Sequence, residues 1–450
     1  MVTTSSLPAA DRFSEVNLIA DPLYGYIEIT NGTPGAPGER ALLDSPWLQR
    51  LRRVHQLQSA WWVFPSAEHS RFVHLLGAMH LASLFARRID ASLRAAFPDA
   101  PSPACVEETL RIAGLLHDVG HGPFGHFFDS EVLSQWDIDH EVIGRSLVEN
   151  ELADIISALR ASPSDLFAPG ESIDPRWVAW VMADADIPGY EAPGWLRACK
   201  PILCGPATVD NLDYVRRDAY MCGIALGPVD VQRLIHYSFI TDGTMALHMH
   251  AAAALQMFLA SRLYMYTQVY HHRTGRRFDL AMHEIFADTI RLLLPGNPLE
   301  HRDAYLQLND WAVLEAVQRW QRSPEGTEQR RLGEAWGRLL RRDLHWHLAY
   351  ETIAHRGADL SMLQERLVAA VPTVTARIQV DIVSAKIAPY NPMAEHGFVA
   401  MYDPIKGTVE RHHTAEMIER LPQHNQMVRV FTDSVDAVPA LYAASQELMF

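Results

Sequence analysis

The stretch LLHDVGHGPFGHFFD, residues 115–129, constrains the fold and the chemistry of this chain more than any other segment. It holds three histidines and two aspartates in an otherwise apolar or glycine-rich setting. Neighbouring side chains on a helix point about 100° apart, so the side chains of His117 and Asp118 can both bind one ion that lies beside the helix. Gly122 and Pro123 then interrupt that helix. Buried histidines can be ordinary polar core groups, but several together need charge compensation, which a metal or an anion would supply.

Two further segments can contribute ligands to the same ion. RFVH at 71–74 opens the helix before the central stretch, and DNLDYVRRD at 210–218 opens a helix long after it. One His, the His-Asp doublet and a distant Asp make a ligand set of mixed nitrogen and oxygen type. This set suits Mn²⁺, Fe²⁺, Co²⁺, Ni²⁺ or Zn²⁺ better than a Mg²⁺ site built from oxygen alone. Four protein ligands would leave positions for water and a phosphate oxygen.

The remaining histidines near the stretch are candidates for proton transfer and for binding phosphate oxygens: His121, His126 and His140. Asp129 lies three residues after His126 and therefore on the same helix face, where it could orient that imidazole. The alternatives are that Asp129 is a helix-surface charge and that His140 is an ordinary polar helix residue.

Composition narrows the class of protein. The 450 residues can bury a large core, and we expect one big domain plus a smaller appendage. The net charge of −15 argues against a protein that binds nucleic acid over its whole surface, but it is compatible with a local basic pocket. Four cysteines form no CxxC pair, so any metal must be held by His and Asp. Without a secretory signal or an apolar run of about 18 residues, we expect a soluble, cytoplasmic protein that does not span a membrane.

The hydrophobic patterns predict a mainly α fold. A short β element is expected at 16–29 and a loop at 30–40, and helical periodicity begins near Asp44. We expect helices at about 71–96, 106–118, 124–135, 139–161, 208–222 and 229–237, then a long one near 245–293 and further helix to about 370. From Thr373 apolar residues alternate, which predicts strands and a last helix at 436–448. The predicted division is a helical catalytic domain at 1–370 and a small C-terminal α+β module at 371–450.

Five segments and the tail together resemble the HD phosphohydrolase superfamily, and within it the deoxynucleoside triphosphate triphosphohydrolases. The segments are DPLYGYIE (21–28), DSPWLQRLRRVHQL (44–57), VFPSAEHSRFVHLLG (63–77), IAGLLHDVGHGPFGHFFD (112–129), DNLDYVRRD (210–218) and the tail RVFTDSVDAVPALYAA (429–444). HD alone is a weak signal, whereas HDxGHGPFxHxFD with its flanking blocks is specific. The resemblance implies an HD-domain helical core.

The resemblance assigns roles position by position. It implies that the metal ligands are His74, His117, Asp118 and Asp210. It implies that the catalytic residues around the triphosphate are His121, His126, Asp129 and His140. Substrate would be bound by Gln56 and Leu57 at the sugar, Arg71 and His271 at phosphate, and Tyr214 and Asp218 against the sugar. A close-packed tyrosine would exclude a 2′-hydroxyl by sterics and so favour deoxynucleotides.

The chain departs from the family pattern at several binding positions. Asn211 stands where a phosphate-binding lysine is expected, Thr267 where an arginine is expected, and Gly275 where a base-packing tyrosine is expected. Arg273, Arg276 or Arg277 could replace the lost charge, or could be surface arginines in salt bridges.

The resemblance also bears on regulation and assembly. Asp44, Gln49 and Arg52 match residues that bind an activating nucleotide between subunits, although the helix needs such residues for capping and packing as well. An asparagine expected just before Asp21 is Ala20. By resemblance we expect a homo-oligomer, either a dimer or a tetramer.

The leading hypothesis is a metal-dependent enzyme that hydrolyses a deoxynucleoside triphosphate to deoxynucleoside and inorganic triphosphate, with Mg²⁺ as a candidate ion on the triphosphate. A second hypothesis keeps the site but changes the substrate to another nucleotide or makes the protein a nuclease. A third, of another class, is a nucleotide sensor without catalysis. Base preference, native metal and physiological role are not contained in the sequence.

Overall fold

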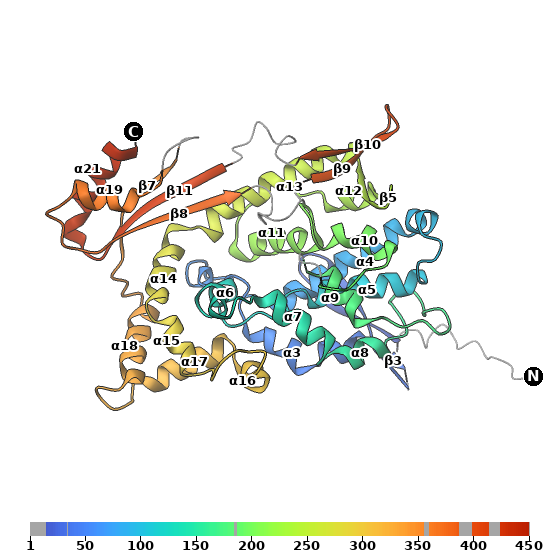
Figure 1. Ribbon diagram of the computed structural model, residues 1–450, viewed down its shortest axis with the longest axis horizontal. Coiled ribbons are helices and arrows are strands. Elements are labelled where there is room, and N and C mark those ends of the chain that lie inside the picture. The colour runs from blue at the N-terminus through green and yellow to red at the C-terminus, as the bar shows by residue number, and fades with distance from the viewer. Residues whose placement is uncertain are drawn as a thin grey trace, which may run out of the picture.

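The centre of the fold is α4 (Arg71–Ala96), which packs against α5 (Pro103–Leu116) and α11 (Val209–Cys222). In the computed structural model these helices lie in the middle of the ribbon (Figure 1), and the structure describes residues 15–33, 35–183, 187–354, 360–386, 398–413 and 424–449. Helix α5 begins sharply because the Ser102 side chain accepts a hydrogen bond from the Cys105 amide, with Pro103 in its first turn. Nearly every residue of α5 is buried, so this helix forms core on all its faces.

The N-terminal segment matches its predicted pattern. Strands β1 (Val16–Asp21) and β2 (Gly25–Thr30) form an antiparallel pair, as expected for 16–29. The predicted loop contains two-residue strands and a short helix that lead to α3: β3 (Gly32–Thr33), β4 (Ala36–Pro37), α2 (Glu39–Leu43) and α3 (Pro46–Arg50). Helix α3 starts at Pro46, where the Ser45 hydroxyl accepts from the Leu48 amide.

The predicted helices around the central stretch are present, some in pieces. Helix α4 has the predicted bounds, and the segment 139–161 is divided into two helices. The helices that follow α5 are α6 (His126–Glu131), α7 (His140–Glu149), α8 (Ala153–Ala158), α9 (Pro175–Val181), α10 (Gly194–Cys199) and, after α11, α12 (Val231–His236).

The segment predicted as one long helix near 245–293 is mainly helical, but it is not continuous and its first residues are not helix. Residues 245–248 belong to β6 (Thr244–His248), which forms a hairpin with β5 (Ser238–Thr241) through Asp242 and Gly243, whose φ angles are 49° and 74°. Two left-handed residues make the tight turn that matches the twist of a hairpin, and Asp-Gly is its usual sequence. The remainder is α13 (Ala252–Met265), a π turn (Tyr266–Tyr270), α14 (Arg273–His283) and α15 (Phe286–Arg291).

The expectation of continuous helix to about 370 is also wrong in part. After α16 (Arg302–Gln307), α17 (Asp310–Trp320) and α18 (Glu328–Leu340), strand β7 (His347–Ile353) precedes α19 (Leu363–Ala370). Strand β7 pairs antiparallel with β11 (His424–Thr432). Seven residues of an apolar stretch cannot be assigned to strand by periodicity alone, and here the distant partner strand decides the conformation.

The mainly α fold with a small α+β module is confirmed. The C-terminal strands and last helix are β8 (Ile378–Lys386), β9 (Phe398–Asp403), β10 (Thr408–His413), β11 and α21 (Val438–Met449). One sheet has the order β7-β11-β8 and lies beside α19 and α21 (Figure 1). The other has the order β10-β9-β6-β5, in which β9 runs parallel to β6 of the helical body. The division at residue 370 stays a prediction, but both sheets take strands from before it.

Within the described ranges, every helix falls short of the length and apolarity needed to cross a bilayer.

Candidate active site

Four predicted metal ligands converge from three helices that are far apart in the sequence. His74 comes from α4, His117 and Asp118 from the end of α5, and Asp210 from the first turn of α11. The Nε2 atoms of His74 and His117 lie 3.3 Å apart. The Oδ1 atom of Asp210 is 3.1 Å from Nε2 of His74 and 3.4 Å from Nε2 of His117. Asp118 completes the group, with its Oδ1 3.5 Å from Nε2 of His117.

The other ring nitrogen of each histidine is already occupied. Nδ1 of His74 lies 2.8 Å from Oδ2 of Asp213, and Nδ1 of His117 lies 2.9 Å from the carbonyl oxygen of Gly114. Such partners set the tautomer and turn Nε2 toward an ion. Gly77 makes room for the first contact, since a Cβ at this position would collide with the Asp213 carboxylate.

The electrostatics of the group keep its carboxylates ionised. Burial alone would raise the pKa of Asp210, but hydrogen bonds from His117 and His74 outweigh it and hold the pKa well below its ordinary value. Burial alone would lower the pKa of His74, but its hydrogen bonds to Asp210 and Asp213 raise that pKa to about 10. Two histidine nitrogens and two carboxylates concentrated at one point thus attract positive charge, as protons or as a cation.

The donor set fits a divalent transition metal. Ligand atoms at about 2.1 Å from one ion and roughly at right angles lie about 3 Å from each other. The separations of His74 from His117, of Asp210 from both histidines and of Asp118 from His117 are 3.1 to 3.5 Å. Imidazole nitrogen with carboxylate oxygen is the ligand chemistry of Mn, Fe, Co, Ni and Zn ions. His74, His117, Asp118 and Asp210 are therefore the residues that would hold the ion.

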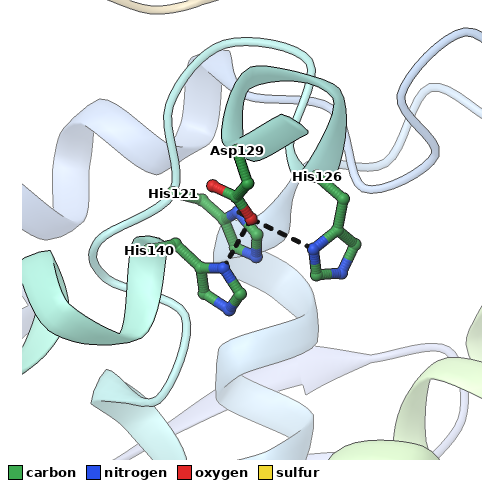
Figure 2. A group of neighbouring side chains, drawn as sticks. All are labelled: His121, His126, Asp129 and His140. Atoms are coloured by element: carbon green, nitrogen blue, oxygen red, sulfur yellow. Dashed lines mark hydrogen bonds and ion pairs between the residues drawn. The ribbon is translucent and has the colours of Figure 1, made fainter. Parts of the chain in front are cut away.

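The second cluster consists of His121, His126, Asp129 and His140 (Figure 2). Oδ2 of Asp129 lies between two imidazoles, 2.6 Å from Nδ1 of His140 and 3.2 Å from Nδ1 of His126. The His121 and His140 rings stack, with centroids 3.7 Å apart and planes 10° from parallel. The sequence pairs Asp129 with His126, and the structure adds the shorter contact to His140.

Local sequence explains how these rings meet. Helix α7 starts at His140 because the Asp139 carboxylate accepts from the Val142 amide. Gly120 lets the turn after Asp118 lie directly on that helix end, since a Cβ there would collide with the His140 carbonyl oxygen and the Gly144 amide.

The pKa values of the two stacked histidines, His121 and His140, are shifted in opposite directions. Burial, Arg71 and His140 hold the pKa of His121 well below its ordinary value. Burial would also lower the pKa of His140, but the hydrogen bond to Asp129 outweighs it and raises that pKa. Nε2 of His121 lies 3.4 Å from Oδ1 of Asp118 and its Nδ1 lies 3.9 Å from Oδ2 of Asp129, so this buried ring lies between the two clusters.

Both clusters border one cavity of about 530 Å³, a volume in the range of nucleotide-sized ligands. The predicted residues that line it are Gln56, Leu57, Arg71, His117, Asp118, His126, His140, Asp210, Tyr214, Asp218 and His271. His74, His121 and Asp129 lie behind this wall, in contact with residues that line it.

The predicted substrate-binding residues differ in how many of their side-chain polar atoms already have partners within the protein. The buried Oε1 of Gln56 has no hydrogen-bond partner among the described residues. Asp218 is held at both oxygens, by Nε2 of His69 at 2.8 Å and by the Tyr270 hydroxyl at 2.7 Å. Arg71 forms a short ion pair with Asp118. Gln56 is therefore free to bind a hydroxyl, whereas both oxygens of Asp218 are already engaged. Arg71 keeps a buried Nε without a hydrogen-bond partner among the described residues, so it can still donate to a ligand.

The predicted regulatory residues lie away from this cavity. Nε2 of Gln49 donates to the Leu43 carbonyl oxygen at 2.7 Å, and Nε of Arg52 donates to Oε1 of Gln49 at 2.9 Å. Asp44 is an exposed partner of Arg40. These contacts account for the residues within one chain, and a regulatory role for them stays a prediction.

Sequence reasoning missed Asp213, Tyr270 and Arg262. Asp213 follows Asp210 by three residues on α11, and this one-face spacing could have indicated a supporting role. Tyr270 belongs to the π turn, a geometry that often marks functional sites and has no simple sequence signal. Arg262 lies in the mainly apolar helix α13, and a single arginine in such a sequence gives no local signal of a binding role.

Comparisons with known proteins agree with this geometry. The HD domain family matches residues 71–171, and the HD associated region matches residues 229–398. An uncharacterized Bacillus subtilis protein, YwfO, is 25% identical over 75% of this chain and 73% of its own length. The deoxynucleoside triphosphate triphosphohydrolase SAMHD1 of Danio rerio is 25% identical over 92% of this chain and 71% of its own length. The SAMHD1 homolog of Dictyostelium discoideum is 24% identical over 65% of this chain, which spans only 53% of that relative.

Solved structures share the fold. A hypothetical protein from Aquifex aeolicus superimposes with a TM-score of 0.70 at 24% identity, covering 96% of this chain and 100% of that one. A phosphohydrolase from Bacteroides thetaiotaomicron superimposes with a TM-score of 0.67 at 21% identity, covering 93% of this chain and 100% of that one. The chain is a member of the HD-domain proteins and joins an HD domain to an HD associated region.

Proposed function

We propose that this protein is a metal-dependent deoxynucleoside triphosphate triphosphohydrolase. The observation that carries the proposal is that one cavity of about 530 Å³ is bordered by the His-Asp ligand set, by the cluster around Asp129 and by the unpartnered Gln56 carbonyl oxygen. Metal, proton donors and a hydroxyl-binding group are the three components that cleavage of a nucleotide at its α-phosphorus requires. The name of the Danio rerio relative supports the same substrate class.

In the proposed reaction, the oxygen of a water molecule bonds to the α-phosphorus while the bond between that phosphorus and the 5′ oxygen breaks. The 5′ oxygen needs a proton to leave as a hydroxyl. His126 is the candidate donor, because its ring lines the cavity and its Nδ1 faces Asp129, which leaves Nε2 for the substrate. The products are a deoxynucleoside and inorganic triphosphate. A divalent ion held by His74, His117, Asp118 and Asp210 would polarise the phosphate and acidify the attacking water.

The remaining residues bind and orient the substrate. Gln56 would accept a hydrogen bond from the 3′-hydroxyl at its unpartnered Oε1. Tyr214 lines the cavity from α11, where its ring would crowd a 2′-hydroxyl. The pKa of Tyr214 is raised well above its ordinary value, by burial first, so the ring remains neutral beside the sugar.

A product assay tests the proposal. The full chain is incubated with each of the four dNTPs and with ATP and GTP under Mn²⁺, Co²⁺ and Mg²⁺, and chromatography separates nucleoside from mono- and diphosphate. We expect deoxynucleoside and triphosphate from the wild type, and loss of activity and bound metal in His117→Ala. Nucleoside monophosphate would favour a phosphohydrolase acting on another nucleotide, and tight nucleotide binding without turnover would favour a sensor.

Activation and assembly are tested in the same assay. We propose that a guanine nucleotide at Asp44, Gln49 and Arg52 stabilises a homo-oligomer. Addition of GTP should then raise the rate and the mass measured by light scattering, and Arg52→Ala should remove both effects. An unchanged mass and rate would contradict this regulation and leave the catalytic proposal standing.

A further inference from the structure

The basic residues predicted to compensate for the missing phosphate-binding charges are committed elsewhere. Arg276 forms ion pairs of 2.8 Å with both Asp279 and Asp381. Arg277 donates to the Trp346 carbonyl oxygen at 2.6 Å. The side chain of Arg273 is 62% exposed, and this residue does not border the cavity. These three arginines are therefore poor candidates for the lost charge.

Asn211 cannot take over the function of the expected lysine either. Its Oδ1 accepts from the Thr208 amide at 2.7 Å, and its own amide donates to the Thr208 hydroxyl at 3.2 Å. This reciprocal pair is a capping box, which satisfies two amides at the start of α11. Asn211 thus serves the helix end that presents Asp210, and a phosphate chain lying there still lacks a cation.

Arg262 on α13 is a buried cation on the wall of the same cavity. The residue is only 5% exposed, yet Nε and Nη1 of its guanidinium have no hydrogen-bond partner among the described residues. Unpartnered N–H groups on a buried cation are costly, since burial removes the water that would otherwise bind them. A fold retains such a group where a ligand satisfies it.

The surroundings of Arg262 keep it charged and near the candidate metal centre. Burial alone would lower its pKa, but the neighbouring Tyr214, Tyr266 and Asp210 outweigh burial and raise it. Its guanidinium carbon lies 5.7 Å from the centre of the Tyr266 ring, at the start of the π turn. Helix α13 packs against α11, which places Arg262 on the side of the cavity where Asn211 replaces a lysine.

We infer that Arg262 is a second phosphate-binding cation beside the predicted Arg71, with Nε and Nη1 donating to oxygens of the substrate's phosphate chain. A guanidinium offers two parallel N–H groups to one phosphate, and its charge-assisted hydrogen bonds are stronger than neutral ones. The inference rests on the proposed function for its nucleotide, but the binding of phosphate can be measured without turnover.

The test uses inorganic tripolyphosphate as the probe and calorimetry on the full chain. Arg262→Gln should raise the dissociation constant about 10- to 100-fold, the effect of losing one or two charge-assisted hydrogen bonds. The control Arg273→Gln removes an equal charge outside the cavity and should bind as the wild type does. Melting temperatures of the variants show whether each is folded.

A conservative variant guards against misfolding. Arg262→Lys keeps the charge but loses the paired N–H groups, so binding should weaken several-fold. The inference is overturned if the wild type does not bind tripolyphosphate, or if a folded Arg262→Gln or Arg262→Lys binds it as tightly as the wild type.

Two results separate this inference from the proposed function. If the wild type hydrolyses no dNTP but Arg262→Gln still loses tripolyphosphate binding, the function is wrong and the phosphate role of Arg262 stands. If the wild type hydrolyses dNTPs and both Arg262 variants keep the wild-type KM and tripolyphosphate affinity, the inference about Arg262 fails alone.

Discussion

At the scale of single residues, Asp213 fixes the orientation of the His74 imidazole, so that its Nε2 faces the candidate metal site. Its Oδ2 lies 2.8 Å from Nδ1 of His74. Arg217 holds both oxygens of this carboxylate, with Nε donating to Oδ2 at 2.8 Å and Nη2 donating to Oδ1 at 2.9 Å. Asp213→Asn should lower metal affinity about 10- to 100-fold, because an amide orients the imidazole less well and makes it less basic. Metal content after dialysis against graded chelator measures this. Asp288→Asn, a change at an exposed ion pair, is the control, and equal metal content in both variants would contradict the role of Asp213.

His80 makes stability depend on pH. Burial first, then the charges of Arg111 and Arg87, lower the pKa of His80 from 6.5 to about 4 in the fold. The unfolded chain therefore takes up the proton first, so the free energy of unfolding falls as pH drops from about 6.5 toward about 4. Between pH 7 and pH 5, His80→Gln should lose about 1–2 kcal/mol less than the wild type in urea unfolding. Equal losses in the two proteins would show that His80 is not responsible.

At the scale of elements, the turn after Asp118 must lie against the first residues of α7. A Cβ on Gly120 would collide with the His140 carbonyl oxygen, so Gly120→Ala should separate the turn from the helix and unstack His121 from His140. We expect kcat to fall at least tenfold, within the range that proton-transfer groups contribute. Gly227→Ala is the matched control, because a Cβ there meets only the end of the Met257 side chain, at 3.7 Å. Wild-type kcat in Gly120→Ala would refute this packing argument.

A helix or strand could be predicted when its own sequence carries the pattern, and could not when a distant partner strand decides its conformation. Helix α4 has the predicted bounds because its apolar residues repeat with the period of a helix over many turns. Strands β6 and β7 were taken for helix because each is a short apolar run whose conformation depends on a partner strand. The Asp242-Gly243 pair is a local signal for the β5–β6 hairpin that the apolar periodicity alone does not contain.

At the scale of the whole molecule, a bound ion would join α4, α5 and α11. Binding to the folded state alone stabilises it by about 2.7 kcal/mol when free metal exceeds Kd about a hundredfold. Removal of metal by EDTA should therefore lower the melting temperature by a few degrees, and readdition of Mn²⁺ should restore it. Asp210→Ala should show no such dependence on metal. A wild-type melting temperature that ignores EDTA and Mn²⁺ would contradict a shared ion.

The C-terminal sheet also reaches the cavity. Nη2 of Arg429 on β11 donates to the His271 carbonyl oxygen at 2.6 Å, and Arg276 on α14 pairs with Asp381 on β8 at 2.8 Å. Burial, then Arg276 and Arg429, lower the pKa of His271 to about 4, so this ring is neutral at pH 7 and would bind phosphate as a hydrogen-bond donor. The C-terminal module therefore belongs to the architecture of the site.

The sequence by itself determined the helical character, the ligand types and the residues around the central stretch, because helix period, caps and the HD spacing are local properties of neighbouring residues. Only the tertiary structure decided that His140 shares Asp129 with His126 and that Arg262 borders the cavity. These facts depend on side chains that are distant in the chain or on competition between partners. Such contacts form only when helices pack, and no local pattern encodes them.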